Sequence, residues 1–311
     1  RHGAGHLGSC RSGAADMSDW RKELERLEGA YSDHTLRGYA ADMQQFELWC
    51  SSHGHIALPA SPETLVAYVN EEAQRLLPST LGRRLCGIAR IHRLMRHPDP
   101  SKDEDVKLAV RRARRKKPAR PDQALGVTAK MRDCLIKECT DDLIGLRDEI
   151  LLRVGFDTLC RRGELVSLLA GDLFENERGN LSILVRRAKN DPTGEGRVAP
   201  LSTKTSERIR HWIEAAGIVD GALLRPIYRN KVLRRFLDPV VVSRVLKKLA
   251  RRHAQGSKLE KGVSGHSLRV GAAQQLTVDG HGILQIMRAG GWKSMNVVAR
   301  YIENVDLDLW K

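Results

Sequence analysis

The chain has 311 residues, enough for two ordinary domains that each bury a core of their own. It carries 53 Lys and Arg against 38 Asp and Glu, and the formal net charge of +15 favours a polyanionic partner, most commonly nucleic acid. No apolar run approaches the roughly 20 residues that a membrane-spanning helix needs, so we expect no membrane segment.

The cysteines indicate an intracellular protein, and no signal peptide is visible at the N-terminus. The six cysteines show neither a disulfide framework nor the spacing of a zinc site, and we interpret them as reduced thiols. The first residues are rich in Gly, His, Arg and Ser and lack the apolar segment of a signal peptide.

The N-terminal part of the chain is predicted to form an all-helical domain over residues 17–110. Residues 1–16 are expected to be a disordered extension or a tag, because Met17 would make a natural start. Within the domain, apolar residues recur at helical spacing behind polar residues that are good helix caps. The predicted helices begin at Ser32, Ser61 and Ser79.

Residues 111–126 are predicted to be a basic linker between two domains. Seven of the ten residues from 111 to 120 are Lys or Arg, and such a run repels itself and builds a core poorly. Pro118 and Pro121 then oppose a continuous helix. We favour contact with a phosphate backbone over a solvated face or a localisation signal. The arginines expected to make that contact are Arg111, Arg112, Arg114 and Arg115.

The second domain, residues 127–311, is predicted to be helical with a small β-sheet. Thr128 is a good cap for its first helix. The best strand candidate is 181–187, followed by a strong turn signal over 189–196 and a returning strand at 197–201. Further helices are predicted at 143–156, 164–169, 205–216, 240–253, 267–278 and 283–287.

Two arginines are candidates for holding a phosphate. Cleaving a phosphodiester without a metal requires cations on the non-bridging oxygens, where negative charge grows in the transition state. Arginine suits this role because its planar fork grips two oxygens and keeps its charge. Arg161 and Arg269 are the candidates, and no carboxylates cluster beside them as a metal route would need. We therefore expect no metal and no cofactor.

Four further residues complete a candidate cleavage site. Tyr301 is the candidate nucleophile, and its phenol, with an ordinary pKa near 10, needs nearby positive charge or a base. Lys189 is a candidate general acid for the leaving oxygen. His266 is suited to share the nucleophile's proton, and the Trp292 indole to donate to a phosphate oxygen. Each of these residues taken alone is more often structural, so the inference depends on the ordered set.

The ordered set resembles the tyrosine recombinase (phage integrase) family. That family has an Arg followed by x-x-Glu-Leu, a Lys in a β-hairpin, His-x-x-Arg, a His or Trp, and a Tyr. Trp292 stands where most of the family has His. The resemblance covers most of residues 19–306. The matching segments are Thr158-Leu159-Cys160-Arg161-Arg162-Gly163-Glu164-Leu165, then Lys189, His266-Ser267-Leu268-Arg269, Gly290-Gly291-Trp292 and Tyr301.

The resemblance implies a mainly helical, two-domain, C-shaped clamp around duplex DNA, with an N-terminal core-binding domain and an α+β catalytic domain. It implies that Tyr301 forms a 3′-phosphotyrosine, that Arg161, His266, Arg269 and Trp292 hold the scissile phosphate, and that Lys189 is the general acid. Glu164, one helical turn from Arg161, is expected to orient the phosphate-binding groups. Strands would be exchanged without ATP or metal by a homotetramer on two DNA sites with inverted-repeat recognition elements. The protein would be cytoplasmic, nucleoid-associated, and encoded by a bacterium, phage or plasmid.

The sequence indicates the residues that contact DNA bases less clearly than it indicates the catalytic residues. Arg244 matches a family helix that enters the major groove, where arginine reads guanine. Arg37 and Arg83 are candidates for contacting DNA from the N-terminal domain. Two alternative functions stay open: DNA relaxation by a type IB topoisomerase, and a DNA-binding regulator without catalysis.

Overall fold

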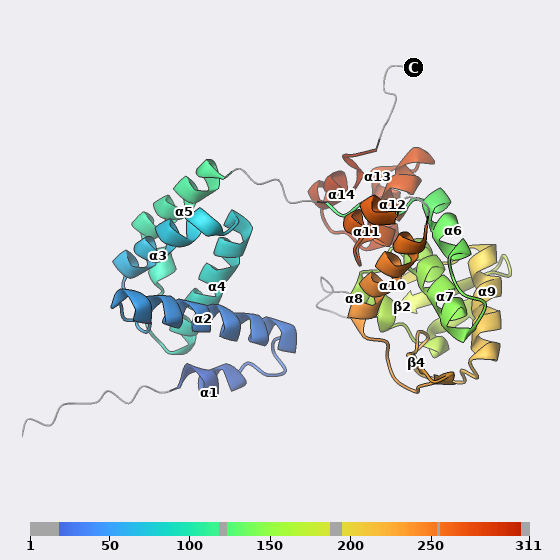
Figure 1. Cartoon of the computed structure of the whole chain (residues 1–311), viewed down its shortest axis with the longest axis horizontal. Helices are drawn as coiled ribbons and strands as arrows, with labels where there is room; N and C mark the ends of the chain where they lie inside the picture. Colours follow the sequence, from blue (N-terminus) through green and yellow to red (C-terminus); the bar gives the residue numbers. More distant parts are fainter. Residues whose placement is uncertain (1–18, 118–122, 187–194, 254–255, 306–311) are drawn as a thin grey trace, which may run out of the picture. The chain divides into compact units, whose positions relative to one another are not determined.

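The computed structural model describes residues 19–117, 123–186, 195–253 and 256–305 (Figure 1). The chain divides into two compact units, residues 1–121 and 122–311. Both units are mainly helical and the only sheets of the described residues are small, as predicted. No helix of the described ranges is both long enough and apolar enough to cross a membrane. The predicted extension over residues 1–16 and Lys189 lie outside these ranges.

The N-terminal unit is built from helices around one aromatic-rich core. Ser32 and Ser61 cap their helices as predicted, whereas the third predicted helix begins at Pro78, which suits the first turn of a helix and replaces the expected start at Ser79. Phe46 and Tyr68 meet edge to face with ring centroids 5.0 Å apart. The elements are α1 (Trp20–Glu25), α2 (Asp33–His53), α3 (Pro62–Arg75), α4 (Pro78–Leu94), the 3-10 helix η1 (Pro100–Lys102) and α5 (Glu104–Lys116).

The basic run begins inside a helix, which corrects the predicted linker. Helix α5 continues to Lys116, so residues 111–116 belong to the N-terminal unit. Val106, Ala109 and Ala113 form its buried stripe, and this spacing places the neighbouring arginines on the exposed side. Self-repulsion does not prevent the helix, because cationic side chains in the last turn interact favourably with the helix dipole.

The second unit places a small antiparallel sheet among helices. Thr128 caps α6, and the predicted hairpin is present with its first strand ending at Val185. The strand Leu173–Glu175 was not predicted, because three residues are too few to show an alternating pattern. The elements are α6 (Ala129–Lys137), α7 (Leu143–Asp157), α8 (Arg162–Val166), the 3-10 helix η2 (Ala170–Asp172), β1 (Leu173–Glu175), β2 (Leu181–Val185), β3 (Arg197–Pro200), α9 (Thr203–Ala215), β4 (Ile227–Tyr228), β5 (Lys231–Val232), α10 (Pro239–Arg252), α11 (Gly256–Gly262), α12 (Ser267–Val278), α13 (Ile283–Gly290) and α14 (Met295–Ile302).

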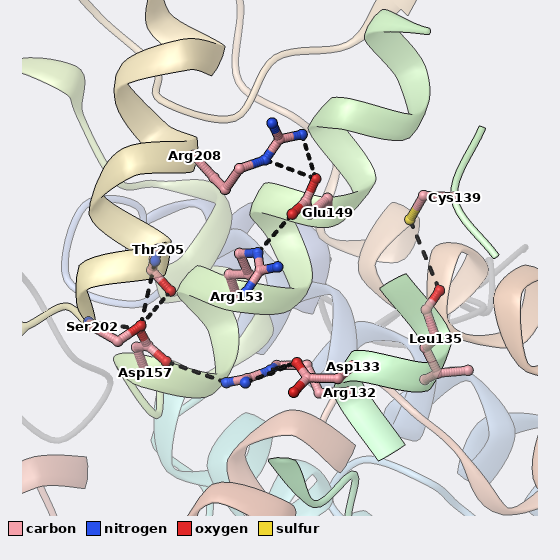
Figure 2. Close-up of polar contacts among 10 residues, drawn as sticks. All are labelled: Arg132, Asp133, Leu135, Cys139, Glu149, Arg153, Asp157, Ser202, Thr205 and Arg208. Atoms are coloured by element: carbon pink, nitrogen blue, oxygen red, sulfur yellow. Dashed lines mark hydrogen bonds and ion pairs between the residues drawn. The ribbon is translucent and has the colours of Figure 1, made fainter. Parts of the chain in front are cut away.

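A network of charged side chains holds the C-terminal end of α7 (Figure 2). Glu149 accepts hydrogen bonds from Arg153 at 2.7 Å and from Arg208 on α9 at 2.6 Å. Burial acts to raise the pKa of the Glu149 carboxyl, but these two guanidinium groups outweigh it and hold the pKa below its usual range. At the end of the helix, Asp157 accepts from the Ser202 hydroxyl at 2.8 Å and pairs with Arg132 at 3.6 Å. The chain therefore leaves α7 from a fixed point.

A second, smaller apolar cluster lies among α12, α13 and α14, the orange-to-red helices of Figure 1. Its buried members come from the turn before α8, from α12, from α13 and the turn after it, and from α14. Val298 is the buried residue of α14, so this cluster is what holds that short helix on the unit. The members are Leu159, Ala272, Ala273, Ile286, Trp292 and Val298.

Candidate active site

Arg161 and Glu164 form one fixed pair. Arg161 directly precedes α8, and Glu164 lies in the first turn of that helix. One carboxylate oxygen of Glu164 accepts from Nη1 of Arg161 at 2.7 Å, and the other accepts from the Arg161 backbone N–H at 3.0 Å. Glu164 is buried and the Arg161 side chain is 20% exposed. The carboxylate thus orients a guanidinium that still reaches solvent.

Arg269 is buried at the centre of the predicted site. It lies in the first turn of α12 and is 1% exposed. Its guanidinium carbon is 3.9 Å from the ring centroid of Trp292 and 5.8 Å from that of Tyr301. Burial first, and the charge of Arg161 second, lower the pKa of Arg269 to about 10. The group is still cationic at neutral pH.

Three buried donors at this point have no hydrogen-bond partner among the described residues. They are Nε and Nη2 of Arg269 and Nε1 of Trp292. The remaining terminal nitrogen of Arg269 donates to the carbonyl oxygen of Leu159. Buried donors without partners are costly and are rare in folded proteins. Their clustering on two adjacent side chains indicates a site for an acceptor-rich anion.

Two glycines shape the turn that carries Trp292. A Cβ at Gly290 would lie 2.0 Å from the Trp292 ring, so the indole packs directly on this backbone. Gly291 ends α13 with a φ of 65°, in the left-handed region that favours glycine. The turn places the Trp292 ring 5.1 Å from that of Tyr301, with 61° between their planes. Trp292 is buried, whereas Tyr301 is partly exposed.

The backbone of Tyr301 is held by two glutamines that sequence reasoning did not identify. The side-chain amides of Gln123 and Gln274 donate to the Tyr301 carbonyl oxygen at 3.2 and 3.3 Å. Asn304 in turn donates to Gln123 at 2.9 Å. Gln123 is 178 residues away from Tyr301 in sequence, so no local pattern connects the two.

His266 lies immediately before α12, at its N-cap, so it shares that helix end with Arg269. Its side chain is exposed at the surface of the site. Surrounding protein atoms, and then the positive charges of Arg269, Arg162 and Arg161, hold the pKa of the imidazole below its usual range. The ring is therefore neutral at pH 7 and able to accept a proton.

The structure brings together Arg161, Glu164, Arg269, Trp292 and Tyr301, with His266 at the edge of the group. Lys189 lies outside the described residues, between β2 and β3. The phage integrase family model matches residues 127–307, which is more than half of the chain. The chain belongs to the phage integrase family.

Relatives of this integrase-family chain match along most of their length. It is 34% identical over 296 residues to the integrase/recombinase xerD homolog of Selenomonas ruminantium, covering 91% of this chain and 85% of that protein. It is 28% identical over 301 residues to the recombinase cre of Escherichia phage P1, covering 91% and 88%. Proteins so named are tyrosine recombinases, and this chain is an enzyme of that kind.

Solved structures of integrases share the fold. The Tn1549 transposon integrase in complex with transposon right end DNA superimposes with a TM-score of 0.64 at 13% identity, covering 93% of this chain and 95% of that one. A lambda integrase dimer bound to a COC′ core site superimposes with a TM-score of 0.62 at 14% identity, covering 94% of this chain and 79% of that one. At these identities the likeness concerns the fold alone.

The predicted DNA-contacting arginines of this integrase lie on exposed helix surfaces. Arg244 is exposed on α10 and Arg37 on α2. Arg83 on α4 is also exposed, but it pairs with the buried carboxylate of Asp42. The four arginines of α5 are exposed, and Arg111 is 3.4 Å from Glu104.

Proposed function

We propose that this chain is a site-specific recombinase that cleaves and rejoins duplex DNA through a 3′-phosphotyrosine intermediate, with neither metal nor ATP. The observation that carries the proposal is Arg269, a buried cation beside Trp292 and Tyr301 with two nitrogens lacking partners among the described residues. A scissile phosphate supplies the acceptors that these donors lack. Arg161, oriented by Glu164, supplies a second cation for the same group.

The reaction balances within the site. The phenolic oxygen of Tyr301 forms a bond to phosphorus and its proton passes to His266, which is neutral at pH 7. The bond from phosphorus to the 5′ oxygen breaks, and Lys189 protonates that oxygen. Arg161, Arg269 and Trp292 donate to the non-bridging oxygens as their charge increases. The phosphotyrosine keeps the energy of the diester, so a 5′-hydroxyl of a second strand can reverse the step.

Duplex DNA is the proposed partner, bound by both units and carrying inverted-repeat elements, with a homotetramer across two sites. The net charge of +15 and the exposed arginines of α2, α5 and α10 support a polyanion. Relaxation of supercoils by a monomer is the alternative that synapsis of two sites would exclude.

The first experiment identifies the substrate. The protein is incubated with fragmented DNA from its source, covalent adducts are denatured and digested, and the DNA attached to the Tyr301 peptide is sequenced. A recurring sequence with 3′-linkage supports the proposal and defines a nicked substrate that traps the intermediate. Failure to recover any adduct from wild-type protein would overturn the proposed function.

Cleavage of that substrate is expected to proceed in excess EDTA at a rate within about twofold of the untreated rate, because guanidinium groups supply the charge that a metal otherwise would. Single-turnover adduct formation on denaturing gels measures this. A strict requirement for added Mg²⁺ would contradict the metal-free mechanism.

The rate should also report the ionisation of His266. Because its pKa is below the ordinary value near 6.5, the cleavage rate should be roughly constant from pH 7 to 8 and fall only at a pH below that ordinary value, where the imidazole becomes protonated. His266→Gln should lower the constant rate between pH 7 and 8 by about 10² to 10⁴-fold. It should also remove the fall in rate at acidic pH, called the acid limb of the profile. His281→Gln, a change at an exposed loop histidine, serves as the control. An unaltered acid limb in His266→Gln would assign the ionisation elsewhere.

A further inference from the structure

The turn between α7 and α8, residues 158–161, is held in a strained conformation. Leu159 has a φ of 51°, in the left-handed region, although it is not glycine. A branched side chain there costs about 1–2 kcal/mol. Leu159 is only 3% exposed and packs in the cluster with Trp292 and Val298. The surrounding structure must therefore hold the turn that delivers Arg161.

Two guanidinium groups from distant segments hold this turn. Arg269 donates to the Leu159 carbonyl oxygen. Arg197 donates through Nη2 to the Thr158 carbonyl oxygen at 2.5 Å, and the same nitrogen is 3.6 Å from the Cys160 sulfur. Arg269 belongs to the proposed phosphate site, whereas Nη2 of Arg197 is directed at the protein backbone. The two arginines thus hold successive peptide groups of one turn.

Arg197 is itself rigidly placed. It is the first residue of β3 and is paired with Val185 of β2. Gly196 before it has a φ of 70°, and a Cβ there would lie 2.7 Å from the Val185 carbonyl oxygen, so a glycine is required at this close approach.

The stem of the same arginine contacts the turn that carries Trp292. A Cβ built on Gly291 would lie 3.2 Å from Cδ and 3.3 Å from Nε of Arg197. The side chain therefore lies between two turns, one leading to Arg161 and the other to Trp292. Asp157, labelled in Figure 2, holds the end of α7, and Glu164 holds Arg161. Between these two points, Arg197 holds the turn at Thr158 and Cys160, and Arg269 holds it at Leu159.

We infer that Arg197 is a positioning residue, which sets the turn of residues 158–161 against the Gly291 turn and so places Arg161 and Trp292 on the same phosphate. The inference rests on the proposed function, because it assigns Arg197 a role in that reaction. Arg197 need not touch DNA for this role. Its effect should appear in the rate of bond cleavage and not in DNA affinity.

The test uses three variants of the full chain on the trapped-adduct substrate. Arg197→Met removes the donor and keeps the stem; Arg197→Lys keeps a charge that reaches one acceptor. Arg210→Met removes an exposed arginine of α9 that pairs with Glu175, and it is the matched control. Displacing catalytic groups by about 1 Å can lower a rate by about 10²-fold, so Arg197→Met should cleave about 10 to 100 times more slowly, with DNA affinity within about threefold. Arg197→Lys should cleave faster than Arg197→Met but more slowly than wild type. The control Arg210→Met should cleave at the wild-type rate.

A substrate with sulfur in place of the leaving 5′ oxygen separates this role from help to the leaving group. A thiolate leaves without a general acid, so the sulfur substrate should rescue Lys189→Ala but leave the defect of Arg197→Met in place. Rescue of Arg197→Met by sulfur, or wild-type cleavage by this variant, would overturn the inference. If circular dichroism shows that Arg197→Met does not fold, Arg197→Lys replaces it in the test. Wild-type cleavage by Arg197→Lys, or rescue of its slower cleavage by the sulfur substrate, would then overturn the inference. Absence of any adduct with wild-type protein would instead overturn the proposed function.

Discussion

Tyr301→Phe is expected to abolish the covalent protein–DNA adduct while leaving DNA affinity within about threefold of wild type. Removing the oxygen removes the nucleophile itself, and loss of a nucleophile in comparable covalent enzymes costs about 10⁶-fold in rate. Affinity is retained because phosphate contacts elsewhere supply most of it. The ring should stay in place, since the Tyr301 backbone is held by Gln123 and Gln274. Denaturing gels of the nicked substrate and a binding titration at fixed salt measure the two quantities.

The matched control is Tyr228→Phe, which removes the hydroxyl of an exposed tyrosine on β4. It should form the adduct at the wild-type rate. An adduct that persists in Tyr301→Phe would assign the nucleophile to another residue. Loss of DNA binding in the same variant would show that its inactivity comes from misfolding and not from chemistry.

Arg269→Met should lower the cleavage rate by at least about 10³-fold, because it removes a buried cation from the phosphate and two donors with it. Its effect on stability should be much smaller than for an ordinary buried side chain, whose truncation costs about 2–5 kcal/mol. The variant loses the hydrogen bond to Leu159 and the contact with the Trp292 ring, each about 1 kcal/mol. It also removes a buried cation with unsatisfied nitrogens, which offsets that loss.

We therefore expect the free energy of unfolding in urea to change by less than about 1 kcal/mol, as is typical of residues that trade stability for function. Arg178→Met, at an exposed position between β1 and β2, is the control. It should change neither the cleavage rate nor the free energy of unfolding. A loss of several kcal/mol in Arg269→Met would mean that Arg269 is chiefly a structural residue. Cleavage at the wild-type rate would remove it from the phosphate site.

Local patterns in the chain were enough to predict most helices and the composition of the site. Ser32, Ser61 and Thr128 cap their helices as predicted, because a cap and the first turn are only three residues apart. The hairpin of β2 and β3 was likewise predicted from adjacent residues. The candidate catalytic residues from Arg161 to Tyr301 were recognisable as a tyrosine recombinase pattern, because they occupy short motifs that follow one another in a fixed order. Their catalytic roles stay predictions, to be tested as described.

The relations between those motifs depend on tertiary packing. The stripe of Val106, Ala109 and Ala113 finds a core to bury against, so the basic run continues as a helix where charge alone predicted a linker. Arg269 meets the Leu159 carbonyl across 110 residues, and Gln123 meets Tyr301 across 178. Spacing along a helix or strand encodes only neighbours a few residues apart. Contacts between distant segments depend on how whole elements pack, and the turn that carries Arg161 is held by two such contacts.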